Sequence, residues 1–271
     1  MKLGVIIPLN DEIETEFGKV HQLGFPTCQL NGWDDSRFTR EVARRVVAAS
    51  QAAGVEISAF WCGWGGPAVW NLVDGPLTLG IVPTAFRSER LKSLLKGADF
   101  TSWLGVKDLV THVGFIPENP NDLEYPGVVS ALRYLAGYCK SNGLNFLFET
   151  GQETPVTLLR TIEDIGLDNL GLNLDPANLI LYGKGNPVDA LDVIGGYVYG
   201  VHAKDGKYPT TGRHLGEEVA LGQGKVDFPR LVARLKEIGY DGALTIEREI
   251  TGEQQMIDIR KAKLMLENLI Q

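Results

Sequence analysis

The sequence is poor in the residues that form disulfides, thiolate metal sites and membrane anchors. Its three cysteines, Cys28, Cys62 and Cys139, show no CxxC spacing, and their odd number is typical of a protein from a reducing compartment. We expect each to be a small buried residue. No apolar run is long enough to span a membrane, and the apolar N-terminal stretch ends at Asn10, too early for a signal peptide. These absences predict a cytoplasmic protein without membrane contact.

Positive charge and phosphate-binding loops are also scarce. The chain has 26 Lys and Arg residues against 34 Asp and Glu residues, and its net charge of −8 argues against a sequence-independent nucleic acid binder. Glycine clusters occur at residues 63–66, 183–185 and 222–225, but none has the Walker or dinucleotide-binding spacing. We therefore interpret these clusters as loops and expect no nucleic acid partner.

What the chain does contain is a regular alternation of apolar and amphipathic segments. Its 271 residues, 44% hydrophobic and 22% charged, are enough for one large globular domain. Near-continuous apolar runs, typical of parallel strands buried on both faces, predict strands at 2–9, 27–33, 55–62, 108–115, 145–150, 170–175, 198–205 and 242–249. Amphipathic patterns predict helices at 38–53, 86–104, 127–141, 155–165, 228–238 and 253–270.

This alternation predicts a closed barrel. Predicted helices are followed by glycines such as Gly54 and Gly105, which take the left-handed conformation that ends a helix. Eight strand–helix units without a break favour a (β/α)₈ TIM barrel over an open sheet. The first strand ends in Pro8-Leu9-Asn10, which lacks the glycine-rich phosphate turn of a doubly wound sheet. We therefore expect residues 1–271 to form a single TIM-barrel domain.

Four consecutive predicted strands end in a polar residue. These residues are Glu149, Asp175, His202 and Glu247. Chemistry in a TIM barrel lies at the carboxyl ends of the strands, so the four should meet at one rim. Converging buried carboxylates repel one another unless a cation joins them. An oxygen-rich set with one imidazole suits Mn²⁺, Mg²⁺ or Co²⁺, with Zn²⁺ as a further candidate, whereas isolated salt bridges or helix caps are the alternative explanation.

Several motifs extend this pattern over nearly the whole chain. They are Phe148–Glu153, Asn173–Asn178, Val201–Asp205, Leu221–Phe228 and Gly239–Glu247. Through these motifs the chain resembles the sugar phosphate isomerase/epimerase superfamily, which has a xylose isomerase-like barrel. The superfamily includes ketose 3-epimerases, inosose dehydratases, hydroxypyruvate isomerases and, more distantly, endonuclease IV. The motifs are specific for the superfamily and not for one substrate.

The resemblance to ketose 3-epimerases implies a mechanism. One divalent metal ion, Mn²⁺ first among the candidates, would be held by Glu149, Asp175, His202 and Glu247. The two glutamates would also be catalytic: one removes the proton beside the substrate carbonyl, and the other returns a proton to the opposite face of the enediolate. The partner would be a small sugar or sugar phosphate. Relatives are commonly dimers or tetramers, so a homodimer or homotetramer is expected.

Further residues are candidates for substrate binding. His112 ends the fourth predicted strand, with a core histidine as the alternative. Trp33, Trp61 and Trp64 follow the second and third strands, and Trp64 is the best candidate for a sugar-contacting wall; rim packing is the alternative. Lys204 lies two residues after His202 and so points the same way, either to a substrate oxygen or to a salt bridge with Glu149 or Asp175.

Three candidates rest on the resemblance. Asn178 stands where endonuclease IV has a further histidine. Glu153 corresponds to a substrate-binding glutamate, although its spacing departs from the ketose epimerase pattern. Arg213, in the loop after the seventh strand, corresponds to an arginine that some epimerases place on the substrate.

Three other functions compete with the epimerase. A dehydratase like inosose dehydratase would expel water from the same enediolate. An endonuclease IV-like enzyme for abasic DNA would need a histidine-rich site for three metals, which four histidines hardly supply. A sugar-binding protein without catalysis would not need both Glu149 and Glu247.

Overall fold

Eight parallel strands close into a barrel in the computed structural model, which describes residues 1–271. Around the barrel they run in the order β1-β10-β7-β6-β5-β4-β3-β2. Their bounds are β1 (Lys2–Pro8), β2 (Thr27–Gly32), β3 (Glu56–Cys62), β4 (Asp108–Thr111), β5 (Asn145–Glu149), β6 (Leu170–Leu174), β7 (Val198–Ala203) and β10 (Ala243–Ile246). The predicted TIM barrel is confirmed, and all eight predicted strands are present, each shorter than predicted.

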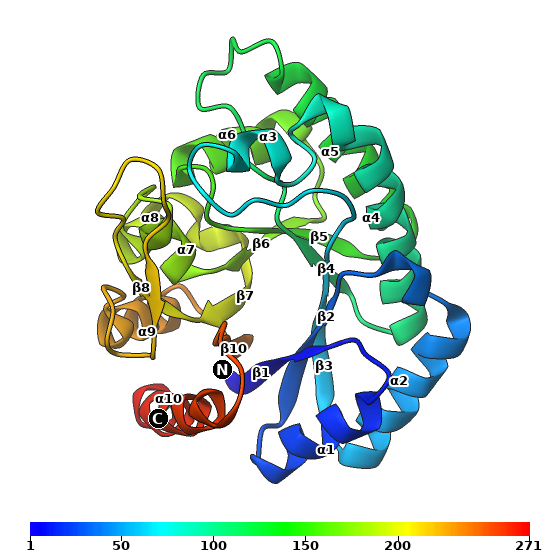
Figure 1. The fold of residues 1–271 in the computed structure, drawn as a ribbon, viewed down its shortest axis with the longest axis vertical. Coiled ribbons are helices and arrows are strands. Elements are labelled where there is room, and N and C mark those ends of the chain that lie inside the picture. The colour runs from blue at the N-terminus through cyan, green and yellow to red at the C-terminus, as the bar shows by residue number, and fades with distance from the viewer.

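Helices surround this barrel (Figure 1). The long ones are α1 (Ile13–Gln22), α2 (Arg40–Ala53), α4 (Thr84–Leu104), α5 (Tyr125–Ser141), α6 (Pro155–Ile165), α8 (Pro187–Ile194), α9 (Phe228–Glu237) and α10 (Glu253–Ile270). Short helices are α3 (Gly75–Thr78) and α7 (Pro176–Leu181), with 3-10 turns at Asp35–Arg37 and Gly195–Tyr197. The six predicted helices are confirmed. Gly54 and Gly105 end α2 and α4 with φ of 66° and 72°, as expected for left-handed C-caps.

A small hairpin departs from the predicted pattern. The predicted strand 198–205 ends at Ala203, and Asp205 begins a separate strand β8 (Asp205–Lys207), which pairs antiparallel with β9 (Glu217–Val219). The buried Asp205 carboxylate accepts hydrogen bonds from the backbone N–H groups of Gly206, Gly222, Gly224 and Val226. This carboxylate explains the glycine cluster at 222–225, since a Cβ on Gly224 would lie 2.0 Å from Asp205 Oδ1.

The apolar core lies mainly between strands and helices. One cluster of buried apolar side chains combines residues from both kinds of element. A separate small cluster of Ala59, Trp61, Val110 and Leu147 lies on β3, β4 and β5. The buried polar residues Gln29, Asn173, His202 and Thr245 lie on β2, β6, β7 and β10. The barrel therefore has an apolar side and a polar side, and the polar side leads to the site described below.

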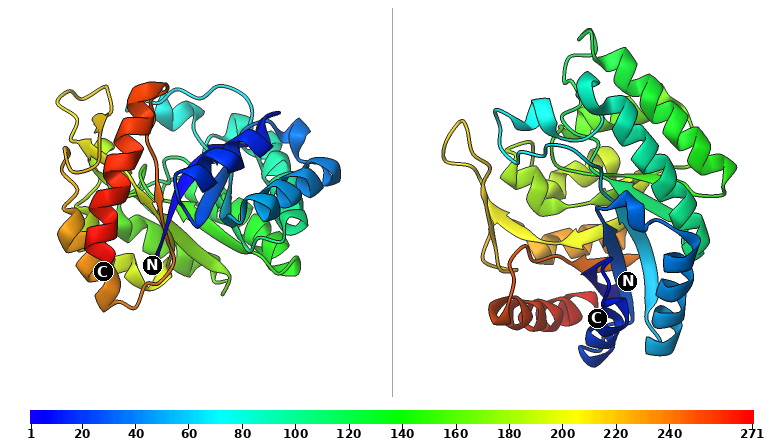
Figure 2. Two further views of the ribbon diagram at one scale, coloured as in Figure 1. Left: turned by 90° about the horizontal axis from the view of Figure 1, so that it is seen from below. Right: turned by 45° about the vertical axis from the view of Figure 1, so that its right-hand side comes forward.

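The remaining features agree with the composition. All three cysteines are buried and free, as predicted. The chain contains no helix with the length and apolar content required to cross a membrane. The two termini lie close together in every view, with the end of α10 beside the start of β1 (Figures 1 and 2).

Candidate metal and substrate site

The four predicted metal ligands meet at the carboxyl ends of neighbouring strands. Glu149 ends β5, Asp175 follows β6, His202 lies in β7 and Glu247 follows β10. One ligand atom from each residue lies within 4.8 Å of the others. Because these strands are adjacent in the barrel, residues separated by up to 98 positions converge without any special loop.

The candidate ligand atoms crowd together, and three of the four have no hydrogen-bond partner. His202 Nδ1 lies 3.1 Å from Glu149 Oε1, 3.0 Å from Glu247 Oε2 and 3.6 Å from Asp175 Oδ2. Asp175 Oδ2, His202 Nδ1 and Glu247 Oε2 are buried and have no hydrogen-bond partner. Buried polar atoms without a partner are costly. Three carboxylates and one imidazole nitrogen aimed at one point fit a divalent cation, which would satisfy all of them.

The local sequence orients Asp175 for this role. Asp175 is the N-cap of α7, and its Oδ1 accepts a hydrogen bond of 2.8 Å from Asn178 N. Pro176 begins the helix, where its missing N–H costs nothing. Thr150 Oγ1 accepts from Asp175 N at 2.8 Å and donates to Asp175 O at 2.9 Å. With Oδ1 occupied by the cap, Oδ2 is left to face the other ligands.

A second pair of side chains orients His202. His202 Nε2 lies 2.7 Å from Gln29 Oε1, and Gln29 Nε2 donates to Asn173 Oδ1 at 3.1 Å. Because the Gln29 amide nitrogen is already a donor, its oxygen must accept from His202 Nε2–H. The proton on Nε2 leaves the Nδ1 lone pair pointing at the carboxylates, which is the tautomer that a metal requires.

Burial and charge act against each other in this cluster. Burial penalises a charged imidazole, but Glu247 and Glu149 outweigh it and raise the pKa of His202 well above its ordinary value. Burial raises the pKa of Asp175. For Glu149 and Glu247, neighbouring positive charges outweigh burial and lower the pKa. The carboxylates thus attract a positive charge to Nδ1, either a proton or a metal ion.

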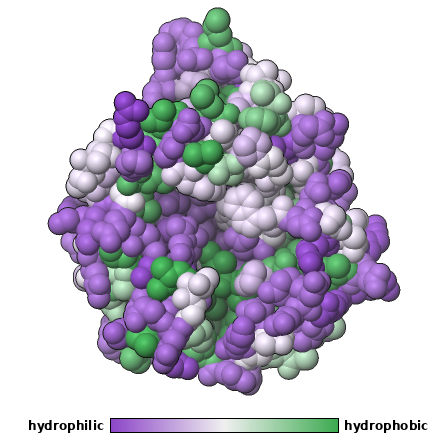
Figure 3. All heavy atoms as spheres, in the orientation of Figure 1, coloured by the Kyte–Doolittle hydropathy of each residue, from purple (hydrophilic) through white to green (hydrophobic).

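A cavity of about 470 Å³ opens above this cluster. Its size is within the roughly 300–1,000 Å³ typical of small-molecule sites. The molecular face shown in Figure 3 is hollowed near its centre. The lining residues are Ile6, Asn31, Trp33, Trp61, Trp70, His112, Glu149, Asn178, Leu181, Tyr182, His202, Lys204, Leu215, Glu247 and Glu249.

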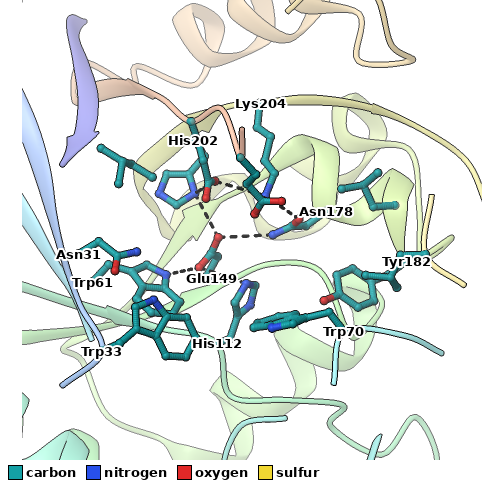
Figure 4. A pocket seen from close by; sticks show the side chains of 15 residues that line it. Asn31, Trp33, Trp61, Trp70, His112, Glu149, Asn178, Tyr182, His202 and Lys204 are labelled. Carbon is teal, nitrogen blue, oxygen red and sulfur yellow. Dashed lines mark hydrogen bonds and ion pairs between the residues drawn. The ribbon is translucent and has the colours of Figure 1, made fainter. Parts of the chain in front are cut away.

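Three predicted substrate residues lie in this lining and surround Glu149 or its neighbours (Figure 4). His112 Nε2 is 3.3 Å from Glu149 Oε2, and Asn178 Nδ2 donates to Glu149 Oε1 at 3.4 Å. The Lys204 ammonium lies 2.7 Å from Glu249 Oε1 and 3.6 Å from Asp175 Oδ2, so the salt bridge to Asp175, the alternative to a substrate contact, is present. Burial opposes the charge of Lys204, yet Glu247 and Glu249 raise its pKa well above its ordinary value.

The other three predicted substrate residues lie outside the lining. Trp64 is buried, donates from Nε1 to His112 O at 3.2 Å and stacks behind Trp70. Glu153 is buried with both carboxylate oxygens unpartnered, and burial raises its pKa to about 8. Arg213 is exposed, and its backbone carbonyl accepts from Leu72 N at 3.0 Å.

A family model named "Xylose isomerase-like TIM barrel" matches residues 17–268. The chain belongs to this family. A xylose isomerase domain protein from Planctomyces limnophilus has 35% sequence identity to this barrel and a TM-score of 0.93, covering 99% of this chain and 96% of that chain. A D-tagatose 3-epimerase-like protein has 21% identity and a TM-score of 0.74, covering 100% and 97% of the two chains, and shows the shared fold.

A curated relative adds little about function. An uncharacterised protein from Methanocaldococcus jannaschii is 35% identical over 99 residues, which is 35% of this chain and 31% of that protein. The match thus spans about a third of the relative's length.

Several residues that line the cavity or support His202 were not singled out by the sequence patterns. Glu249 follows Glu247 by two positions, and this spacing was a usable signal because it places both on one face. Gln29 and Asn173 are polar residues within otherwise apolar strands, which was a second signal. Trp70 and Tyr182 lie in or near loops, where no periodicity indicates the direction of a side chain.

The histidines do not form a larger metal cluster. His112 and His202 are in the cavity lining. His21 bonds to Ala53 O from helix α1, and His214 is exposed in the loop before β9. The histidine-rich trinuclear site of an endonuclease IV-like enzyme is therefore not assembled from these side chains.

Proposed function

We propose that this barrel is a divalent-metal-dependent isomerase or epimerase of a sugar or sugar phosphate, with Glu149 and Glu247 as its acid and base. The observation that carries the proposal is the set of unpartnered, buried ligand atoms of Asp175, His202 and Glu247 at the floor of a small-molecule cavity. Membership of a family whose fold is shared by a D-tagatose 3-epimerase-like protein supports it.

The donor set suits a hard or borderline cation. Glu149, Asp175, His202 and Glu247 would hold it, and we propose Mn²⁺ ahead of Mg²⁺, Co²⁺ and Zn²⁺. When bound, such a cation supplies Lewis-acid polarisation of a substrate carbonyl. The Gln29 hydrogen bond would keep His202 in its ligating tautomer.

The two glutamates have the different surroundings that an acid and a base need. Glu149 is 2% exposed and accepts hydrogen bonds from Trp61 Nε1 and Asn178 Nδ2. Glu247 is more open to the cavity, with 17% of its side chain exposed. Glu149 ends β5 and Glu247 follows β10, with β6 and β7 between these two strands. One would take the proton beside the carbonyl and the other would return a proton to the opposite face.

A dehydratase remains the second candidate, and His112 is the observation that favours it. Its Nε2 lies in the cavity 3.3 Å from Glu149 Oε2, where it would protonate a departing hydroxyl. An epimerase and a dehydratase share the first proton abstraction and differ in their product.

Deuterium exchange tests the proposal. After dialysis against EDTA and addition of Mn²⁺, a panel of ketoses, their phosphates and inosose is followed in D₂O by NMR. We expect metal-dependent deuterium uptake at the carbon beside the carbonyl, lost in Glu247→Gln and retained in Glu163→Gln, an exposed control on α6. An epimer or a dehydrated ketone then identifies the reaction. No metal-dependent exchange with any sugar would contradict the proposal.

A further inference from the structure

Lys204 places a buried ammonium beside the candidate metal ligands. Its side chain is 3% exposed, and its Nζ lies 3.5 Å from Glu247 Oε2 and 3.6 Å from Asp175 Oδ2. In Figure 4 the side chain extends toward Asn178, whose Oδ1 is 3.4 Å from Nζ. A positive charge in this position competes with a divalent cation, because the same two carboxylate oxygens attract both.

The ammonium nevertheless stops short of those two oxygens. Both distances exceed the roughly 2.7–3.2 Å of an ordinary N–H···O hydrogen bond. Asp175 Oδ2 and Glu247 Oε2 accordingly have no hydrogen-bond partner, although the Lys204 ammonium, a strong donor, lies beside them. Some other group must therefore hold Nζ away from the two candidate ligand atoms.

That group is the Glu249 carboxylate. Glu249 Oε1 lies 2.7 Å from Lys204 Nζ, closer than Glu247 and Asp175. Glu249 lines the cavity, is 55% exposed and is not one of the four candidate ligands. A buried charge needs a partner. Glu249 is such a partner, and it leaves every oxygen of the ligand cluster free.

Two neighbouring strands bring these side chains together. Alternate residues of a strand point the same way, so His202 and Lys204 enter the site in turn at the end of β7. Glu247 and Glu249 do the same after β10, which pairs with β7. His202 Nδ1 meets Glu247 Oε2 at 3.0 Å, and one step further along Lys204 Nζ meets Glu249 Oε1. The spacing of two in both strands thus builds the ion pair directly beside the ligand cluster.

The backbone at Glu249 is also anchored. The intervening Arg248 pairs with Glu218 of β9 and with Asp258 of α10. Glu249 N donates to Glu218 Oε1 at 3.3 Å. Glu249 therefore meets Lys204 from a position that the surrounding elements fix.

From these contacts we infer that Glu249 is a positioning residue that holds the Lys204 ammonium off Glu247 and Asp175, so that their oxygens are left for the metal ion. The inference rests on the proposed function and deepens it. Without Glu249, the carboxylates that remain near Lys204 are candidate metal ligands. A shift of about 0.6 Å would bring Nζ into hydrogen-bond distance of Glu247 Oε2, where it would occupy a lone pair and repel an incoming cation.

Titration of the EDTA-treated full chain with Mn²⁺ tests the inference, followed by calorimetry and by electron paramagnetic resonance of free Mn²⁺. We expect Glu249→Ala to weaken Mn²⁺ binding by about 10–100-fold, the range typical of groups that support metal ligands without touching the metal. Glu253→Ala is the matched control, because it removes an exposed carboxylate from the first turn of α10, four residues further on. It should leave the Mn²⁺ affinity unchanged.

A double-mutant cycle with Lys204→Met separates positioning from the mere loss of a negative charge. We expect Lys204→Met to bind Mn²⁺ at least as tightly as wild type, because the competing ammonium is gone. Adding Glu249→Ala to Lys204→Met should then change the Kd by no more than about twofold, since no ammonium is left to position. A long-range effect of charge would instead weaken binding equally in both backgrounds.

Unchanged Mn²⁺ affinity in Glu249→Ala, or an equal weakening in wild type and in Lys204→Met, would overturn the inference. If Lys204→Met does not fold, the comparison of Glu249→Ala with Glu253→Ala decides alone, since both residues are exposed. Failure of the proposed function gives a different result. Metal-dependent exchange on a sugar with unchanged Mn²⁺ affinity in Glu249→Ala would support the function and overturn the inference. Mn²⁺ binding that depends on Glu249, without exchange on any sugar, would support the inference and contradict the reaction.

Discussion

At the scale of single residues, the site depends on groups that touch neither metal nor substrate. Gln29 and Asn173 fix the ring nitrogen that His202 offers. Groups that hydrogen-bond to a ligating histidine typically change metal affinity by about 10–100-fold when removed. In the proposed metal site, Gln29 would therefore support metal binding through its hydrogen bond to His202.

Replacing Gln29 tests this dependence. Gln29→Leu keeps a similar volume but removes the acceptor for His202 Nε2–H, so we expect Mn²⁺ affinity to fall by about 10–100-fold in a calorimetric titration. Gln51→Leu, on the exposed face of α2, is the matched control. Equal Mn²⁺ affinities in the two variants would show that Gln29 does not orient His202.

Glu153 makes a prediction about pH. Burial disfavours the charged carboxylate and raises the pKa of Glu153 from its ordinary 4.5 to about 8. Below pH 4.5 the Glu153 side chain is protonated in both the folded and the unfolded chain. Above pH 4.5 it ionises first in the unfolded chain, so the folded state loses stability as the pH rises to about 8. Glu153→Gln should gain stability over wild type across that window, by at most about 1.4 kcal/mol per pH unit. Urea unfolding at pH 5 and 7.5 checks this.

The exposed Glu163→Gln on α6 is the control for that experiment. If the difference in the free energy of unfolding between wild type and Glu153→Gln stays constant with pH, the assignment of a buried, protonated Glu153 is wrong.

Residue patterns located the candidate metal ligands but not the cavity wall. Glu149, Asp175, His202 and Glu247 share a position at strand ends, so periodicity alone groups them. The wall depends on the path of the loop after β3, and no local rule sets that path. Trp64, expected to face the sugar, supports Trp70 from behind.

At the scale of elements, the loop after β3 depends on one side chain from α4. Removing the Arg90 guanidinium would leave four backbone carbonyls without their donors. We expect Arg90→Met to lower the free energy of unfolding by about 3 kcal/mol and to open residues 64–74 to limited proteolysis. Arg44→Met, exposed on α2, is the control. If residues 64–74 resist the protease equally well in Arg90→Met and in the control, Arg90 does not stabilise this loop.

Regular elements were predictable, and irregular ones were not. Buried apolar runs indicate the eight strands, and amphipathic patterns followed by a glycine C-cap indicate the main helices. Helix α7 is short and buried throughout, so it lacks a polar face and shows no amphipathic period. The β8–β9 hairpin is stabilised by Asp205 and distant backbone groups, which sequence spacing does not reveal.

At the scale of the whole molecule, barrel closure assembles the candidate metal site. The chain itself brings β5, β6, β7 and β10 together, and with them three carboxylates that repel one another. A cation that binds the native state alone stabilises it by mass action, by about 2.7 kcal/mol at 100 times its Kd. Folding and metal binding should therefore be coupled.

The most direct test of the central claim is a titration of the EDTA-treated protein with Mn²⁺, followed by calorimetry and electron paramagnetic resonance. We expect one Mn²⁺ per chain, coordination that includes a nitrogen ligand, and loss of binding in Asp175→Asn. Absence of stoichiometric binding in wild type, or undiminished binding in Asp175→Asn, would contradict it.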